Sequence, residues 1–141
     1  AGANPNLKDR EGDTALHLAA LARDFSSIRR IMEHGGFAAE RNELGITALH
    51  IAARNADIAS MRILLEHGAD ASIADRSGRT PLVSALQSGS RNAGDAVRLL
   101  LRWQTNLESR DNDGLSILDH ARASGREDML HGIILEQAKQ R

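Results

Sequence analysis

Apolar residues recur along this chain in short blocks that are separated by glycine and polar residues. The block TALHLAA at Thr14–Ala20 returns as TALHIAA at Thr47–Ala53, 33 positions later, and in a weaker form as TPLVSAL at Thr80–Leu86 after another 33 positions. A fixed period in this range is the signature of a stacked repeat protein. Each unit is too small to bury its own apolar face, so neighbouring units must pack together into one continuous core.

A second apolar block in each unit has the spacing of a helix. SMRILLEHG places Met61, Leu64 and Leu65 at positions i, i+3 and i+4, and SIRRIMEHG repeats this spacing in the unit before it. These positions form one face of a helix, and Gly35 and Gly68 then suit the end of that helix. We therefore predict an Ala-rich first helix and a Leu/Ile-rich second helix in each unit, with Leu64 in the core between units.

A turn precedes the first helix of each unit. In the first unit it runs from Asp9 through Gly12 to Thr14, and the same order of a polar residue, glycine and Thr or Ser recurs in the later units. Glycine adopts the positive φ of a tight turn at little cost, and a Thr hydroxyl can cap the helix that follows. Pro81 fits the first helical position.

The third and fourth units depart from this pattern. The third unit is longer, so we expect Ser88–Gly94 to form an extended loop between its two helices, and it has Val83 where the earlier units have His17 and His50. The fourth unit ends in polar residues, which is typical of a terminal cap. The turns divide a single domain of residues 1–141 into the tail of a preceding unit (1–8), three units (9–41, 42–74 and the longer 75–110) and a C-terminal capping unit (111–141).

The pattern D-x-x-G-x-T-P/A-L-H-x-A-A, followed by an I/M-x-x-L/I-L/M helix and G-A-D, resembles the ankyrin repeat. This resemblance implies an all-α, curved solenoid of stacked helix-turn-helix units with projecting β-hairpin loops. It implies that His17 and His50 are structural and hydrogen-bond the backbone of neighbouring loops. It also implies a protein-binding module whose contact surface is the hairpin tips and the concave face of the first helices. We expect the chain to be part of a longer array or protein.

Composition and motifs argue against other functions. A net charge of −1 provides no field to attract nucleic acid or a membrane surface, and 2% aromatic residues leave little for base stacking or an aromatic cage. No apolar run approaches the roughly 18–20 residues that span a bilayer. No histidine pair has the H-x-x-x-H spacing of a metal site, the segment Gly89–Gly94 lacks the GK[ST] of a phosphate-binding loop, and no nucleophile accompanies Asp119-His120. We therefore expect no enzyme activity, no cofactor and no metal.

The residues that the repeat pattern leaves unexplained are the candidate partner contacts. Leu44, Ile46 and Leu115 are large apolar residues at turn positions, and several arginines lie near them in the repeat register. Two interpretations stay open: scattered exposed apolar residues and a solvated charged face, or a contact patch whose arginines dock an acidic segment. The candidate contacts are Arg10, Asp13, Arg41, Glu43, Leu44, Ile46, Arg54, Asn55, Arg76, Ser77, Arg79, Gln87, Arg110, Asn112, Asp113 and Leu115.

The expected function is a non-catalytic protein–protein interaction module. The alternative is a regulatory or localising ankyrin array attached to a larger multidomain enzyme. We expect the partner to be a protein or peptide segment with acidic and apolar residues, and neither nucleic acid nor a membrane into which the chain inserts. We also expect an intracellular location, in the cytoplasm or nucleus, and a monomeric state for these residues by themselves.

Overall fold

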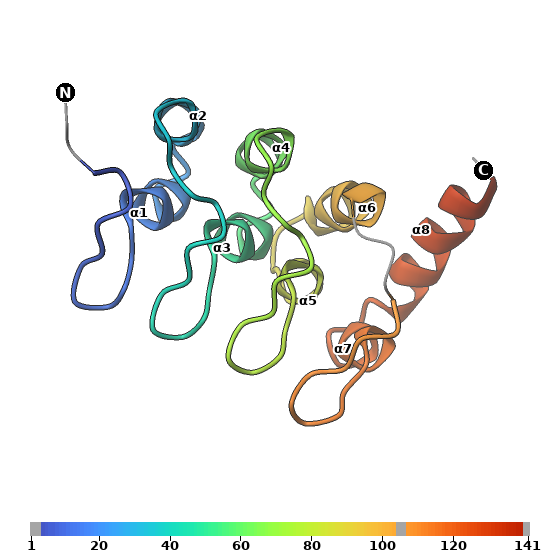
Figure 1. The fold of residues 1–141 in the computed structure, drawn as a ribbon. Helices are drawn as coiled ribbons and strands as arrows, with labels where there is room; N and C mark the ends of the chain where they lie inside the picture. Colours follow the sequence, from blue (N-terminus) through green and yellow to red (C-terminus); the bar gives the residue numbers. More distant parts are fainter. Residues whose placement is uncertain (1–3, 104–106, 140–141) are drawn as a thin grey trace.

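The computed structural model describes residues 4–103 and 107–139, which form helices in two layers. In Figure 1 the layer of α1, α3, α5 and α7 lies between the layer of α2, α4 and α6 and the projecting loops. The described residues contain no sheet, so the predicted all-α solenoid is confirmed. The helices are α1 (Ala15–Leu21), α2 (Phe25–Glu33), α3 (Ala48–Arg54), α4 (Ile58–Glu66), α5 (Pro81–Leu86), α6 (Ala93–Trp103), α7 (Ile117–Ala123) and α8 (Glu127–Lys139).

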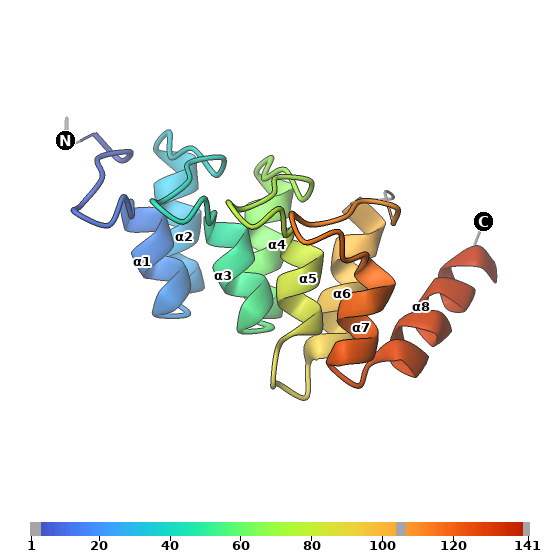
Figure 2. The ribbon, with the colours of Figure 1, turned by 90° about the horizontal axis from the view of Figure 1, so that it is seen from below.

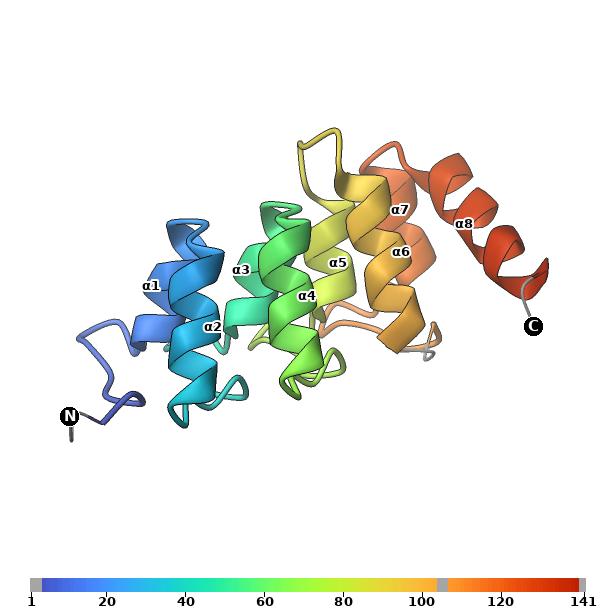
Figure 3. The same cartoon turned by 90° about the horizontal axis from the view of Figure 1, so that it is seen from above.

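The core runs through the whole stack because each helix packs on its own partner and on the next pair. Thus α3 contacts α1, α4 and α5, and α4 contacts α2 and α6. Ala52 and Ala85 are fully buried where first helices meet, while Met61, Leu64 and Leu100 are fully buried on the second helices. The predicted helix face of the second block is therefore the inter-unit core. Figure 3 shows α2, α4 and α6 side by side, with α8 leaning away from them at the C-terminal end.

The loop before each first helix is folded by its first polar residue. In one loop the Asp75 Oδ1 atom accepts hydrogen bonds from the backbone N–H groups of Ser77 (2.9 Å) and Arg79 (3.0 Å). The Asp75 N–H donates to the Arg79 carbonyl at 2.8 Å, which closes the loop. Gly78 has a φ of 82°, a left-handed conformation that favours glycine. The loops reverse the chain, but within the described residues they hold only an isolated bridge between Arg110 and Ser116 instead of a ladder of paired strands.

Neighbouring loops are joined to one another by backbone hydrogen bonds. The Glu43 N–H donates to the Glu11 carbonyl at 3.0 Å, and the Arg76 N–H donates to the Leu44 carbonyl at 3.0 Å. A Cβ atom on Gly45 would lie 2.7 Å from the Arg76 nitrogen, so this approach requires glycine. The loops consequently form a row along one edge of the molecule, which faces the viewer in Figure 2.

A histidine ties each of the first two pairs to the loop of the next. His50 Nδ1 accepts from the Thr47 N–H at 3.1 Å, so Nε2 carries the proton and donates to the Arg79 carbonyl at 2.9 Å. The Thr47 hydroxyl in turn accepts from the His50 N–H. His17 repeats this arrangement and bonds the Ile46 carbonyl at 2.8 Å. The structural role expected for both histidines is confirmed.

The junction between the third and fourth pairs has a different chemistry because Val83 replaces this histidine. The Thr80 hydroxyl is buried there without a hydrogen-bond partner among the described residues. Buried Asp111 connects the two pairs instead. Its Oδ2 atom lies 3.6 Å from Arg79 Nε, in an ion pair, and accepts a hydrogen bond from His120 Nε2 at 2.7 Å.

The segment expected to be an extended loop, Ser88–Gly94, is shorter than predicted. α6 begins at Ala93, because Ala93 is fully buried in the core and extends the helix. Ser88 is 3% exposed, and its carbonyl accepts a hydrogen bond from Arg126. The small polar residues of this segment predicted an extended loop, but the loop is held at both ends, by Ser88 and by Ala93.

We predict that Leu64→Ala lowers the free energy of unfolding by roughly 2–5 kcal/mol, because it opens a cavity in the inter-unit core. Leu135→Ala is the matched control, since the Leu135 side chain is 62% exposed on α8. Urea denaturation followed by circular dichroism measures both variants. Equal transition midpoints for the two would contradict the assignment of Leu64 to the core.

We also predict opposite outcomes for one substitution at two equivalent caps. Thr47→Val should cost about 1 kcal/mol, because Thr47 caps α3 through its hydroxyl. Thr80→Val should leave stability within about 0.5 kcal/mol or raise it, because the lost hydroxyl is buried and has no hydrogen-bond partner among the described residues. Denaturant melts of the two variants would refute the comparison if Thr80→Val were the more damaging change.

Candidate functional site

Two adjoining hollows lie along the exposed side of the first helices. The smaller, of about 240 Å³, lies between α1, α3 and α5, and the larger, of about 570 Å³, lies between α3, α5 and α7. They share Arg54, Arg79 and Gln87 in their walls, so they form one continuous depression. We call it the first-helix groove.

The end of the groove nearest α1 is mainly apolar, although Asp75 and other polar residues also line the smaller hollow. Leu21, Ile46 and Ile51 line the smaller hollow. Leu21 is 56% exposed, and the side chains of Ile46 and Ile51 are half-buried. An apolar surface that remains open to solvent in the folded array is available to an apolar group of a partner.

The other end of the groove is cationic. Arg54, Arg79 and Arg126 line the larger hollow together with Gln87 and Ser124, and no carboxylate is among its lining residues within the described chain. Arg54 is exposed at the end of α3, and no described residue accepts a hydrogen bond from its guanidinium. The positive charge of this end is therefore only partly neutralised by the protein.

Buried Asp111 forms an ion pair with Arg79 at the cationic end of the groove. Its side chain is 2% exposed and accepts from His120 Nε2 at 2.7 Å and from the N–H groups of Leu115 and Asp113, both at 2.9 Å. Burial raises the pKa of Asp111, but the hydrogen bonds from Leu115, His120 and Asp113 outweigh it, so the pKa lies below its ordinary value. The charged carboxylate holds Arg79 at the groove wall.

His50 lines the smaller hollow and has a perturbed pKa. Burial lowers the pKa of His50 below its ordinary value, because the charged form is poorly solvated there, and this effect exceeds the opposing influence of the Arg79 carbonyl. The ring is neutral at physiological pH, in the tautomer that both of its hydrogen bonds require. It positions the backbone of Arg79 at the junction of the two hollows.

Several predicted contact residues make hydrogen bonds within the protein that stabilise the loops. Asp13 is buried, at 8% exposure, and its carboxylate accepts a hydrogen bond from the Asn42 amide at 3.0 Å. The Asn112 side chain donates to the Arg76 carbonyl and so joins two loops. Arg41 and Arg110 donate to carbonyls of their own loops, at Gly45 and Gly114 respectively.

The other predicted contacts divide between the groove and the loop tips. The groove brings together Ile46, Arg54, Asn55, Arg79 and Gln87. The loop tips carry Arg10, Glu43, Leu44, Arg76, Ser77, Asp113 and Leu115, of which Leu44 is 65% and Leu115 40% exposed.

Sequence reasoning missed Ile51 and Arg126 as groove residues. Ile51 lies one helical turn before Asn55, which the helical period of the first block could have indicated. Arg126 stands at the position where Asp24 and Asp57 cap α2 and α4 in the regular units. An arginine at a position where the regular units have a capping aspartate could have indicated that Arg126 has another role.

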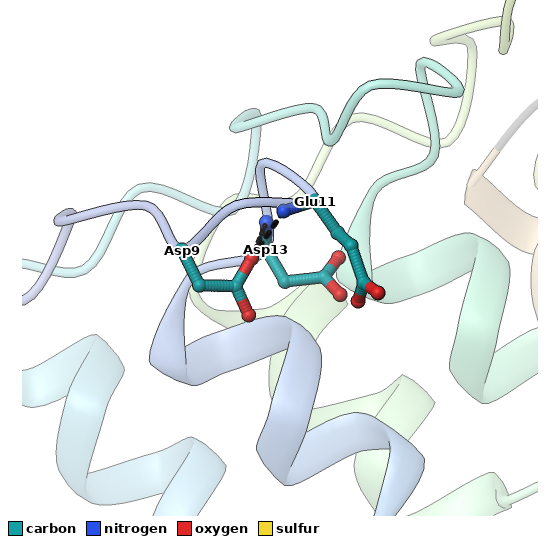
Figure 4. Close-up of side chains that lie close together, drawn as sticks. All are labelled: Asp9, Glu11 and Asp13. Atoms are coloured by element: carbon teal, nitrogen blue, oxygen red, sulfur yellow. Dashed lines mark hydrogen bonds between the residues drawn. The ribbon is translucent and has the colours of Figure 1, made fainter.

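Asp9, Glu11 and Asp13 form an acidic cluster in the first loop (Figure 4), with carboxylate oxygens within 4.8 Å of one another. Asp9 Oδ1 accepts from the N–H groups of Glu11 and Asp13, and Asp13 accepts from Asn42. Asp75 makes the same backbone bonds in a loop without such a cluster, so loop folding explains the arrangement. We assign no metal to it.

No helix in the described part of the chain is both long enough and apolar enough to cross a membrane.

Comparison with known proteins identifies the family. A family model described as "Ankyrin repeats (3 copies)" matches residues 1–75 and again residues 61–140, so the chain belongs to the ankyrin repeat family. A search of curated proteins found no match. Ankyrin repeats are in general protein–protein interaction modules and are typically non-catalytic, which implies protein partners in general terms.

The lowered pKa of His50 predicts a pH dependence of stability. The unfolded state binds the proton more readily, so the contribution of His50 is complete above its ordinary pKa of about 6.5 and is lost as the pH falls below that value. The loss is at most about 1.4 kcal/mol per pH unit. Urea unfolding of the wild type and of His50→Gln between about pH 7.5 and 5.5 should show a smaller decline in the variant. Parallel declines would exclude His50 as the source.

Proposed function

We propose that this protein is a non-catalytic interaction module that binds a protein or peptide partner through its loop tips and first-helix groove. The observation that carries the proposal is the groove itself, in which an open apolar surface adjoins a cationic surface containing Arg54, which has no partner among the described residues. Burial of apolar area supplies affinity, and unneutralised arginines add directional contacts to carboxylates.

The partner that complements this surface carries acidic and apolar residues. Arginine is enriched among the residues that dominate binding energy at interfaces, and burial of an exposed leucine side chain adds apolar contact area. We propose direct side-chain contacts for the exposed members of the predicted set and for half-buried Asn55 and Gln87 in the groove, while the buried or hydrogen-bonded members hold the loops in place. The proposed direct contacts are Arg10, Glu43, Leu44, Arg54, Asn55, Arg76, Ser77, Gln87, Asp113 and Leu115.

Arg54 is a better probe of this surface than Arg79. Arg79→Glu would place a second carboxylate beside buried Asp111, 3.6 Å from the present guanidinium nitrogen, and would destabilise the junction. Arg54 has no hydrogen bond to lose within the described chain. Arg62 on α4 is its matched control, because it is also exposed and without a partner among the described residues, but it lies on the second helix of the same pair.

The test is site-specific photo-crosslinking in an extract of the source cells. p-Benzoylphenylalanine in place of Leu44 should capture a protein that the same probe in place of exposed Leu135 does not capture. Adding Arg54→Glu should abolish the capture, and adding Arg62→Glu should not. Both substitutions should change the free energy of unfolding by no more than about 1 kcal/mol, because both replace surface charges. Capture that depends on Arg62 and ignores Arg54 would refute the proposal.

A further inference from the structure

The groove changes character from one end of the array to the other. Equivalent positions one turn before the end of the first helices read Leu18, Ile51, Ser84 and His120 from the first pair to the fourth. The positions at the end of the helices read Leu21, Arg54, Gln87 and Ala123. Large apolar side chains therefore occupy these positions only in the first two pairs, and the polar ones begin with Arg54 at the end of the second pair's first helix.

The cationic end presents one guanidinium, that of Arg54, with neither an ion pair nor a hydrogen bond among the described residues. Arg126 donates to the Ser88 carbonyl, and Arg79 is held by an ion pair to Asp111 at 3.6 Å, although its Nε atom has no hydrogen-bond partner among the described residues. Arg54 keeps its whole set of donors free among the described residues. One free guanidinium matches one carboxylate in the bidentate geometry that arginine favours, and the two held arginines add positive potential without further loss of side-chain freedom.

We propose that the first-helix groove binds an extended peptide segment of a partner through two anchors: an apolar side chain in the smaller hollow and an Asp or Glu carboxylate in the larger one. This inference rests on the proposed function and specifies its ligand. Charge complementarity favours a carboxylate of the ligand in the larger hollow, because three arginines and no carboxylate line it within the described chain. Nucleic acid is disfavoured because none of the lining residues is Phe, Tyr or Trp.

The spacing of the anchors follows from the spacing of the helices. The smaller hollow is centred on the α1–α3–α5 side and the larger on the α3–α5–α7 side, so their centres are one helix-to-helix step apart. Packed helices are about 8–10 Å apart, and an extended chain covers about 3.3 Å per residue, so the two anchor residues are about three positions apart.

The experiment is a selection of random peptides by display on immobilised protein. Wild-type protein should enrich peptides in which an apolar residue and an Asp or Glu are separated by about three positions, in one chain direction. Arg54→Gln should remove the acidic preference, and Leu21→Ser the apolar preference. Both side chains are exposed and make no hydrogen bond in the described structure, so both variants should fold. Arg62→Gln and Leu135→Ser are the matched controls and should enrich the same peptides as the wild type.

A second measurement uses individual synthetic peptides in a Gly/Ser background and nuclear magnetic resonance titration. A peptide with Leu and Glu at the selected spacing should shift the amide signals of Ile51, Arg54 and Ser124. Changing Glu to Gln should weaken binding about tenfold or more. Enrichment without an apolar–acidic pair, no enrichment at all, or tighter binding of phosphoserine than of Glu would each overturn the proposal.

These outcomes can be separated from failure of the proposed function. If Leu44 crosslinks to a partner in an Arg54-dependent manner while display yields no such peptide, the module binds a folded surface and the linear ligand is wrong. If neither experiment succeeds, the proposed function fails as well.

Discussion

In each of the first two helix pairs, one neutral imidazole ring connects a helix cap to the next loop. His50 accepts from the N–H of its own cap residue, Thr47, and donates across the junction to the Arg79 carbonyl. The ring is buried, so unsatisfied polar groups around it would be costly, and only the neutral tautomer satisfies both bonds. The position of each loop relative to the helix before it therefore depends on this ring, and so does the position of Ile46 and Arg79 in the groove wall.

The third junction shows what happens when the ring is absent. With Val83 in its place, the Thr80 hydroxyl has no partner among the described residues, and the contact between pairs is provided by Asp111, which forms an ion pair with Arg79 and a hydrogen bond with His120. Neutral hydrogen bonds have been exchanged for an ion pair that is partly open to the groove. The cationic end of the groove lies at this junction, and Arg126, which replaces a capping aspartate, contributes to it. Local departures from a regular pattern are expected to coincide with functional surfaces.

The fold was predictable from the sequence because each structural pattern occurs in more than one unit. The apolar spacing at Leu64, the turn glycines and the histidines all recur with the same period, and the structure confirms their roles. Burial of single polar side chains was not predictable in this way. Asp13 reads as a turn residue, but the Asn42 amide of the next unit covers its carboxylate, a contact that needs the three-dimensional stacking of two loops. Arg79 and Arg126 have long side chains whose ends lie far from their own backbone, so the register alone did not place them in one hollow.

The groove belongs to no single helix pair, and this constrains how it can form. Its walls come from α1, α3, α5 and α7, which contact one another only through the stack. Leu21, Arg54 and Arg126 belong to three different units, so the distances between them are fixed only when the units stack. In repeat proteins each unit is stabilised by its neighbours, so the buried alanines that let the first helices approach closely also set the distance between the apolar and cationic ends. The regular positions of the repeat thus determine the geometry of the groove, while the irregular positions determine what it can bind.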